Sequence, residues 1–385
     1  MATDIFTKNI KRGYEQSFPL TKISRKRAKD KKWVTLGIKK SCNHKSSLYK
    51  KFLKHPTQEN KAKYIKYRNL LSKLCKAAQE NYFHDIISET KSSLVKLWET
   101  FGPIINPGKR KELHKIEKIN KEGSILTNKK DIANHFNNYF CNIGKKLQNN
   151  VPTTNKNYKN YLTNQNLNSF FISPVSEDEL LKVIHTINNR KAKGIYDIPA
   201  NIFKRSFNQI KNPLLSLLNM SFSQGIFPDI FKIAKVIPLY KKQDRYLTEN
   251  YRPISLLSYI SKIFEKLMKK RLCSFLNKYN ILYDLQFWFR EGYSTNLALL
   301  DILDDINTAL DNGKYALGIY LDLSKAFDTV CHDILLNKLA HYGIRGPALA
   351  WFKSYLTNRK QLVQLNETQS DLKNIDIGVP QGSVF

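Results

Sequence analysis

The fold is decided by residues 316–328, which have the sequence ALGIYLDLSKAFD. Its first six residues are almost all apolar, a pattern typical of a buried strand, and a carboxylate, Asp322, follows directly after them. A strand held in a sheet keeps its end rigid, so the pattern predicts an acidic side chain at the mouth of a cleft. An aspartate at such a position is more often a helix cap or turn former than a metal ligand, so Asp322 alone does not decide the function.

Strands and helices are predicted to alternate upstream of this segment. A helix is expected from Ser294 to Asn312-Gly313, and the apolar runs at residues 234–239 and 252–257 predict two neighbouring strands. Between the second of these strands and the helix that begins at Ser294, apolar residues at helical spacing predict a long helix over residues 260–275.

Two local signals predict further helices in the region between residues 170 and 230. Ser176 with Glu179 forms a capping box that opens a helix, and Gly225 is a natural helix stop. Strands mixed with helices in this way indicate the α+β class.

Residues 1–160 are predicted to form a basic, helical linker region. The first 50 residues hold 14 basic and 3 acidic side chains, concentrated in runs such as Arg25-Lys26-Arg27. Apolar residues at steps of three and four predict a helix over residues 60–88 and another that begins at an N-cap, Asp131. The Asn-rich stretch at 148–168 places a domain boundary near residue 160.

The composition of the 385 residues predicts a polyanionic partner. A formal charge of +32 with a pI near 9.8 is typical of nucleic-acid-binding proteins, although a solvated basic surface has the same charge. The five cysteines form no C-x-x-C pair, so neither a zinc site nor a disulfide framework is predicted. No leader-like or membrane-spanning stretch is evident, and we expect a nuclear or cytoplasmic protein without membrane contact.

Four blocks in order resemble the reverse transcriptases of jockey-like non-LTR (LINE-type) retrotransposons. The segment YLDLSKAFD (320–328) is similar to motif A of these enzymes, and GVPQGS (378–383) is similar to motif B. The two other blocks are VIPLYKK with NYRPISLL (236–242 and 250–257) and QFWFR with Ser294-Thr295 (286–290 and 294–295). The resemblance extends over nearly the whole chain, because residues from Lys32 onward match the region between endonuclease and polymerase.

The resemblance implies an RNA-directed DNA polymerase that adds dNTPs to a DNA primer on an RNA template by two-metal phosphoryl transfer. Asp322 would bind the catalytic Mg²⁺ ions, with Mn²⁺ as the alternative, and the Leu323 carbonyl would supply a further oxygen ligand. Phe327 matches the aromatic residue that lies under the incoming sugar and disfavours rNTPs; without the motif it would be taken for a core residue.

Five further residues are assigned by the same resemblance. Lys241, Lys242 and Arg252 match positions that close over the incoming triphosphate, where Arg offers a planar fork to phosphate oxygens. Gln381 and Gly382 match the loop that meets the template and the nascent base pair, and Asp328 is expected to be structural.

The implied architecture is a helical basic region at 1–160, between an endonuclease and a polymerase, followed at 161–385 by part of a right-hand polymerase. That part would comprise the fingers and an incomplete palm, without a thumb or the later Asp-Asp hairpin. The pair Asp304-Asp305 precedes Asp322 and is expected to be a solvated helical face. We therefore expect a truncated, inactive reverse transcriptase.

Two residues depart from the family pattern. Trp288 stands where the family usually has Gly, so strain is expected in a tight turn, and Tyr196 stands where it usually has Asp. Two alternatives stay open: a binding protein that holds RNA or DNA without catalysis, and a chain that does not fold stably because its sheet has a naked apolar edge.

Overall fold

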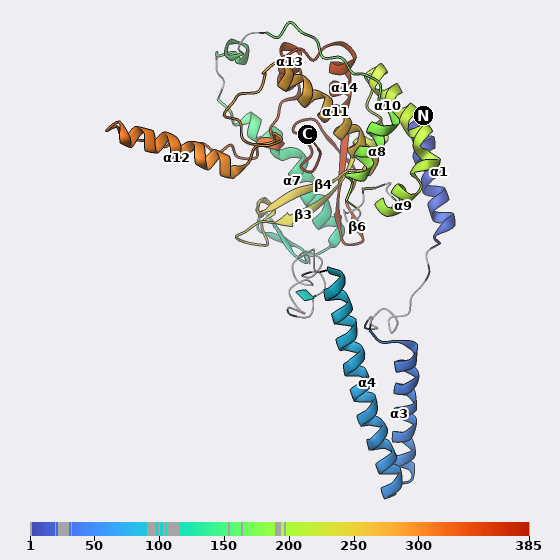
Figure 1. Ribbon diagram of the computed structural model, residues 1–385. Coiled ribbons are helices and arrows are strands. Elements are labelled where there is room, and N and C mark those ends of the chain that lie inside the picture. Colours follow the sequence, from blue (N-terminus) through green and yellow to red (C-terminus); the bar gives the residue numbers. More distant parts are fainter. Residues whose placement is uncertain are drawn as a thin grey trace. The chain divides into compact units, whose positions relative to one another are not determined.

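The computed structural model describes residues 2–19, 21, 31, 33–90, 98, 101–102, 105, 116–152, 155–162, 165–188, 194–195 and 198–384 (Figure 1). The chain divides into two compact units, one of residues 1–18 and 116–385 and the other of residues 19–115. The mixed helix and sheet content agrees with the predicted α+β class. The functional boundary expected near residue 160 stays a prediction, and the run Arg25-Lys26-Arg27 lies outside the described residues.

The smaller unit contains a hairpin of two helices. Helix α3 (Leu36–Lys54) begins after Thr35, whose side chain accepts a hydrogen bond from the Ile38 amide, and α4 is the long helix Gln58–Thr90 predicted from the apolar spacing. The core between them is thin, since Ile38 and Leu71 are the buried apolar residues of the two helices. Most of the apolar stripe predicted on α4 is therefore only half-buried.

The larger unit contains the other helices. Six of them are long: α1 (Ala2–Ser17), α7 (Lys129–Asn149), α10 (Phe207–Gln224), α11 (Tyr259–Lys278), α12 (Thr295–Asp311) and α14 (Gly346–Leu356). Shorter helices are α8 (Glu177–His185), α9 (Ala200–Arg205) and α13 (His332–His341), with 3₁₀ turns at Tyr158–Tyr161, Asp229–Lys232, Thr248–Asn250 and Ala326–Asp328.

Several predicted helix ends are confirmed. Ser176 accepts a hydrogen bond from the Glu179 amide, Ser294 caps α12, and Gly225 ends α10 in the left-handed conformation at φ 66°. The cap predicted at Asp131 is wrong by three residues. Asn128 is the cap, because its side chain accepts from the Lys130 amide, and Asp131 lies in the first turn.

A five-stranded sheet lies in the larger unit. Its strands are β3 (Ile233–Tyr240), β4 (Tyr251–Leu256), β5 (Arg359–Leu365), β6 (Thr368–Gln369) and β7 (Lys373–Ile375). β3 is antiparallel to β4 and parallel to β5, and β5 pairs with both β6 and β7. A separate hairpin joins β1 (Ile119–Lys121) and β2 (Ser124–Leu126). The predicted strands at 234–239 and 252–257 are confirmed.

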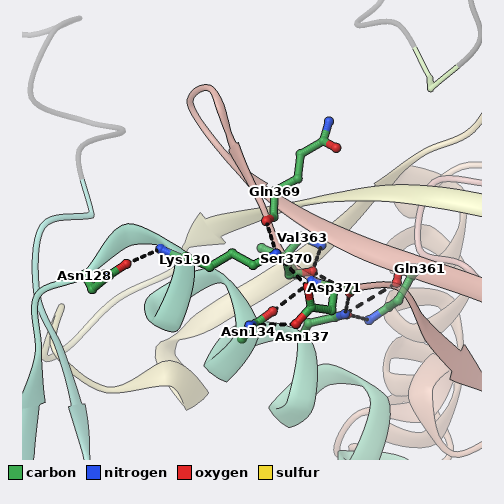
Figure 2. Close-up of polar contacts among 9 residues, drawn as sticks. All are labelled: Asn128, Lys130, Asn134, Asn137, Gln361, Val363, Gln369, Ser370 and Asp371. Carbon is green, nitrogen blue, oxygen red and sulfur yellow. Dashed lines mark hydrogen bonds and ion pairs between the residues drawn. The ribbon is translucent and has the colours of Figure 1, made fainter.

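Helix α7 packs on one face of this sheet. Its Ile132, Phe136 and Phe140 share a buried cluster with Val236 of β3 and Val363 of β5. Polar contacts extend the interface, as Figure 2 shows: buried Asn137 donates to the Asp371 carbonyl at 2.7 Å and accepts from Gln361 at 3.1 Å. Lys130 and Asn134 hold the Asp371 carboxylate, at 2.7 and 3.0 Å. The loop between β6 and β7 is thereby fixed to α7.

A second core is formed around α11 and α14. Nine residues of α11 are buried, and Phe264 packs against Phe222, Phe227 and Phe231. The fully buried Trp351 of α14 donates to Ser221 Oγ at 3.1 Å, so even its polar atom is satisfied. This core supports the base of the loops described below.

The strand predicted at residues 316–321 is wrong. Residues 314–323 have no regular secondary structure, and Leu317, Ile319 and Leu321 are exposed. The physical reason is that a strand needs a neighbour to satisfy its backbone groups, and no strand in the described part of the chain pairs with this segment. The preceding α12 has no buried residue, and it projects from the rest of the unit in Figure 1.

Within the described residues, none of the helices combines the length and apolar character that membrane crossing requires.

Candidate nucleotide-binding site

Two loops that lie 50 residues apart in sequence meet in the larger unit. The 3₁₀ turn Ala326–Asp328 lies against residues 378–381: the Val379 amide donates to the Phe327 carbonyl at 2.8 Å, and the Gly378 amide to the Val330 carbonyl at 2.9 Å. The Gln381 side-chain amide lies 3.0 Å from both carboxylate oxygens of Asp328. The motif A and motif B segments therefore form one connected surface.

Close backbone approach in this surface requires glycine. Gly378 has φ +86°, and a Cβ there would lie 2.8 Å from the Phe327 carbonyl oxygen. From the other side, a Cβ on Gly144 of α7 would lie 2.2 Å from the Asp328 carbonyl oxygen. A side chain at either position would push the turn at Asp328 away from its neighbours.

Strand β4 also contacts the surface formed by the motif A and motif B segments. The Ser255 amide donates to the Gln381 carbonyl at 2.8 Å, and Gly382, at φ +124°, would place a Cβ 2.6 Å from the Ser255 carbonyl oxygen. The predicted loop residues Gln381 and Gly382 thus lie directly beside the end of the NYRPISLL block.

A buried carboxylate, Glu265, holds the residue that follows the motif B loop. Glu265 of α11 accepts hydrogen bonds from Ser261 at 2.9 Å, Tyr355 at 3.3 Å and the Val384 amide at 2.9 Å. Removal from water raises the pKa of Glu265, against the opposing effects of the Val384 amide and Arg359. Arg359 is also fully buried, and its Nε and Nη2 have no hydrogen-bond partner among the described residues.

Asp328 is half-buried. Burial raises the pKa of its carboxyl, while the Gln381 amide and Lys325 act in the opposite direction. Lys325 itself has a left-handed φ of 55°, which turns the chain into the 3₁₀ turn.

The three predicted triphosphate residues are exposed on one hairpin. Arg252 faces Leu239 across the β3–β4 pair, and the Lys241 amide donates to the Asn250 carbonyl at 2.9 Å, which continues the hairpin past its last paired residues. Lys241 and Lys242, which follow the end of β3, and Arg252 near the start of β4 therefore lie at one end of the hairpin. Arg252 lies on the face opposite α7, because the buried residues of β4 are the alternate ones, Tyr251, Pro253 and Ser255, and Tyr251 packs against Phe136 of α7.

The predicted metal ligands are not assembled. Asp322 and Leu323 lie in the exposed, unpaired segment, and the described residues contain no group of three or more His, Cys, Asp or Glu side chains suited to a metal ion. These residues alone do not fit a complete Mg²⁺ site. Phe327 is 45% exposed, and its ring is perpendicular to that of Phe289 at 6.2 Å.

The strain expected at Trp288 is not found there. Its φ is outside the left-handed region and its side chain is 63% exposed, so it crowds no neighbour. The strained position is the next residue, Phe289, at φ 62°. Tyr196 lies outside the described residues. Asp304 and Asp305 are exposed on α12, as predicted.

Sequence reasoning missed Glu265, His332 and Gly144. His332 contacts the Gly378 carbonyl at 2.7 Å, and all three act on loops far away in sequence. Glu265 carried a usable signal, since a lone acid on the apolar face of a predicted helix must find polar partners when it is buried.

Comparison with known proteins supports the resemblance. The family model described as "Reverse transcriptase (RNA-dependent DNA polymerase)" matches residues 240–385. The chain is 32% identical over 215 residues to the "Probable RNA-directed DNA polymerase from transposon BS" of Drosophila melanogaster. It is 31% identical over 216 residues to the "RNA-directed DNA polymerase from mobile element jockey" of the same fly.

Each of these alignments covers 56% of this chain, and 24% and 23% of the two relatives respectively. The polymerase of the jockey element from Drosophila funebris is similar at 30% identity over 214 residues, which are 55% of this chain and 23% of that protein. The chain thus spans about a quarter of the length of these relatives.

Proposed function

We propose, from the premise that residues 240–385 are a reverse transcriptase domain related to those of jockey-like non-LTR retrotransposons, that this chain contributes to RNA-directed DNA synthesis. Its substrates would be dNTPs, a DNA primer and an RNA template. In this proposal, residues 161–385 are the fingers and part of the palm, and residues 1–160 are the basic linker. A nuclear or cytoplasmic location follows from these partners.

One observation carries the proposal: the motif A turn, the motif B loop and β4 meet through direct contacts. The hydrogen bonds from Gln381 to Asp328 and from Ser255 to Gln381 join three blocks that lie far apart in sequence. Such a surface would place the aromatic side chain of Phe327 beside the motif B loop, where an incoming sugar and the nascent base pair would be held. The family resemblance alone does not require these contacts.

The triphosphate would be bound by Lys241, Lys242 and Arg252. All three side chains are exposed and carry basic groups that can donate to phosphate oxygens. Arg252 adds a planar pair of donors for phosphate oxygens. The Gln381 side chain donates to Asp328 and its carbonyl accepts from Ser255, so a template contact at this loop would be made by the Gln381 backbone N–H and by Gly382.

Asp322 would provide one carboxylate ligand for Mg²⁺, with the Leu323 carbonyl beside it. The metal would supply charge neutralisation for phosphoryl transfer. Because Asp322 is not grouped with other carboxylates in the described residues, we propose that the 385-residue polypeptide by itself does not extend a primer. Primer extension on a homopolymer template with Mg²⁺ tests this, and incorporation that is abolished by Asp322→Ala would overturn it.

Nucleotide binding tests the proposed function without catalysis. Fluorescent dTTP should bind the 385-residue chain, and Arg252→Ala should weaken binding by about 10- to 150-fold, because a hydrogen bond to a charged group is worth about 1.5–3 kcal/mol. The matched control is Arg205→Ala on α9, which removes an exposed arginine away from the β3–β4 hairpin. Equal losses in the two variants, or no dTTP binding at all, would contradict the proposal.

A second candidate function is nucleic-acid binding without catalysis. It is favoured by the net charge of +32 and by α3, whose sequence holds six lysines and no acidic residue. Binding should weaken steeply with salt, because each neutralised phosphate adds about 0.9 to the slope of log K against log salt on duplex DNA. A flat salt dependence in a filter-binding titration would exclude this function.

A further inference from the structure

Phe289 combines a strained backbone with an exposed aromatic ring. Its φ of 62° is in the left-handed region, which is a genuine outlier for a bulky residue. The residue is 74% exposed, so burial of the ring offsets little of the strain. Backbone strain of this kind persists only where the surrounding structure imposes it, and it is concentrated at functional sites. No role was assigned to Phe289 from the sequence.

The loop around Phe289 is held by hydrogen bonds from its own side chains. On one side of Phe289, Arg290 Nη1 donates to the Tyr283 carbonyl at 3.0 Å. On the other side, Gln286 Nε2 donates to the Trp288 carbonyl at 3.3 Å. These contacts restrain the backbone before and after Phe289, and they fix the direction in which its side chain leaves the loop.

The Phe289 ring contacts the ring of Phe327. The two ring centres are 6.2 Å apart, and the angle between the ring planes is 87°. This edge-to-face arrangement is one that aromatic pairs prefer. Within the described residues it is the one ring contact of Phe289, so the strained conformation brings this ring to the residue that is expected under the incoming sugar.

Phe327 has a fixed backbone but a ring with few neighbours. The Val379 amide donates to the Phe327 carbonyl at 2.8 Å, which holds the backbone of the motif A turn. Phe327 is 45% exposed, and Phe289 is its one ring partner in the part of the chain that the structure describes. A fixed backbone still leaves several side-chain rotamers open, and a neighbouring ring reduces that choice. The Phe289 ring therefore restricts where the Phe327 ring lies.

We propose that Phe289 is a positioning residue for sugar discrimination, because its ring holds the Phe327 ring in the orientation that excludes a 2′-hydroxyl. The inference rests on the proposed function, in which Phe327 lies under the sugar of the incoming dNTP. With Phe289 in place, the Phe327 ring cannot turn away from a 2′-hydroxyl. Without it, the ring adopts another rotamer and a ribonucleotide fits. Loss of the Phe289 ring should therefore strengthen ribonucleotide binding and leave deoxyribonucleotide binding unchanged.

Competition against fluorescent dTTP with the full 385-residue chain tests this role. The competitors are dTTP and ribothymidine triphosphate, which differ only in the 2′-hydroxyl, so the ratio of their dissociation constants measures sugar discrimination. Phe289→Asn removes the ring and introduces a residue that tolerates the left-handed φ. It should lower the ratio by about 2- to 12-fold, the range that an aromatic pair supports, with the affinity for dTTP unchanged.

Matched variants separate positioning from other effects. Phe289→Tyr keeps an aromatic ring at this position and should keep the wild-type ratio. Trp288→Ala removes the neighbouring ring, which is exposed and lies outside the Phe289–Phe327 pair, and should also keep it. Phe327→Ala should abolish discrimination. Adding Phe289→Asn to Phe327→Ala should change the ratio no further, because the effects of two residues that act as one pair are not additive.

The outcomes distinguish this inference from the proposed function. An unchanged ratio in Phe289→Asn would overturn the positioning role while Arg252-dependent dTTP binding still stood. A ratio that falls because dTTP binds more weakly, or that falls further in the double variant, would also overturn it, since Phe289 would then support the site in general or contact the sugar itself. Absence of any dTTP binding would overturn the proposed function, and the role of Phe289 with it.

Discussion

Helices α11 and α12 come from similar sequence patterns but have opposite surroundings. Both begin after a serine cap and both carry apolar residues at helical spacing. Nine residues of α11 are buried, whereas no residue of α12 is. The spacing of apolar residues therefore predicts a helix and its apolar face. That face stabilises the protein only when another element packs against it and buries it.

The largest expected difference concerns matched core and surface truncations. Phe264→Ala on α11 should lower the free energy of unfolding by about 3–5 kcal/mol, because it leaves a cavity among three other phenylalanines. Leu300→Ala on α12, at a side chain that is 61% exposed, should change it by less than about 0.5 kcal/mol. Urea denaturation followed by tryptophan fluorescence measures both. Similar losses would show that α12 is buried in solution.

Removing the serine caps of α11 and α12 compares the same two helices, with a smaller expected effect on stability. Ser258 accepts hydrogen bonds from the Ile260 and Ser261 amides of α11, and Ser294 accepts one from the Leu297 amide of α12. Ser258→Ala should lower the free energy of unfolding by about 1 kcal/mol. Ser294→Ala should leave the urea midpoint unchanged and only reduce helical circular dichroism. A shifted midpoint in Ser294→Ala would mean that α12 unfolds together with the core.

The smallest expected effect is that of Glu265→Gln on the pH dependence of stability. This substitution removes an ionisable group and keeps the size of the side chain. Burial raises the pKa of Glu265, so its contribution is fully present below the unfolded pKa of about 4.3 and is lost as pH rises through the folded value. Glu265→Gln should therefore flatten the fall in urea midpoint on the alkaline side of that pKa. Asp304→Asn on exposed α12 is the control and should not alter the profile. Identical profiles for wild type and Glu265→Gln would contradict the assignment.

Much of the fold follows from local signals, and the exceptions have physical causes. Strand β5 was missed because two of its buried positions are polar, Arg359 and Gln361. The sequence of β5 therefore lacks the alternation of apolar and polar residues that predicts a strand. At residues 316–321 a strand was predicted that the structure does not form. An apolar run predicts a strand but does not show whether a second strand is available to pair with it.

The candidate site was predictable only in part. The blocks that carry Phe327, Gln381 and Arg252 were recognised from sequence, and the structure brings the loops of the first two together. The partners of these loops were not predictable, because the contacts of Glu265 with Val384 and of Gly144 with Asp328 join distant parts of the chain. The roles assigned to the site residues stay predictions: Asp322, Leu323, Lys241, Lys242, Arg252, Phe327, Gln381 and Gly382.

The parallel pairing of β3 with β5 has a consequence for synthesis on the ribosome. Val236 pairs with Val363, so at about 5–20 residues per second roughly 6–25 s pass between translation of the two residues. During that interval the β3–β4 hairpin has an unpaired edge, and α7 lacks part of the surface it covers in the finished protein. The nascent chain should be a target for chaperones that recognise apolar segments until β5 has left the exit tunnel.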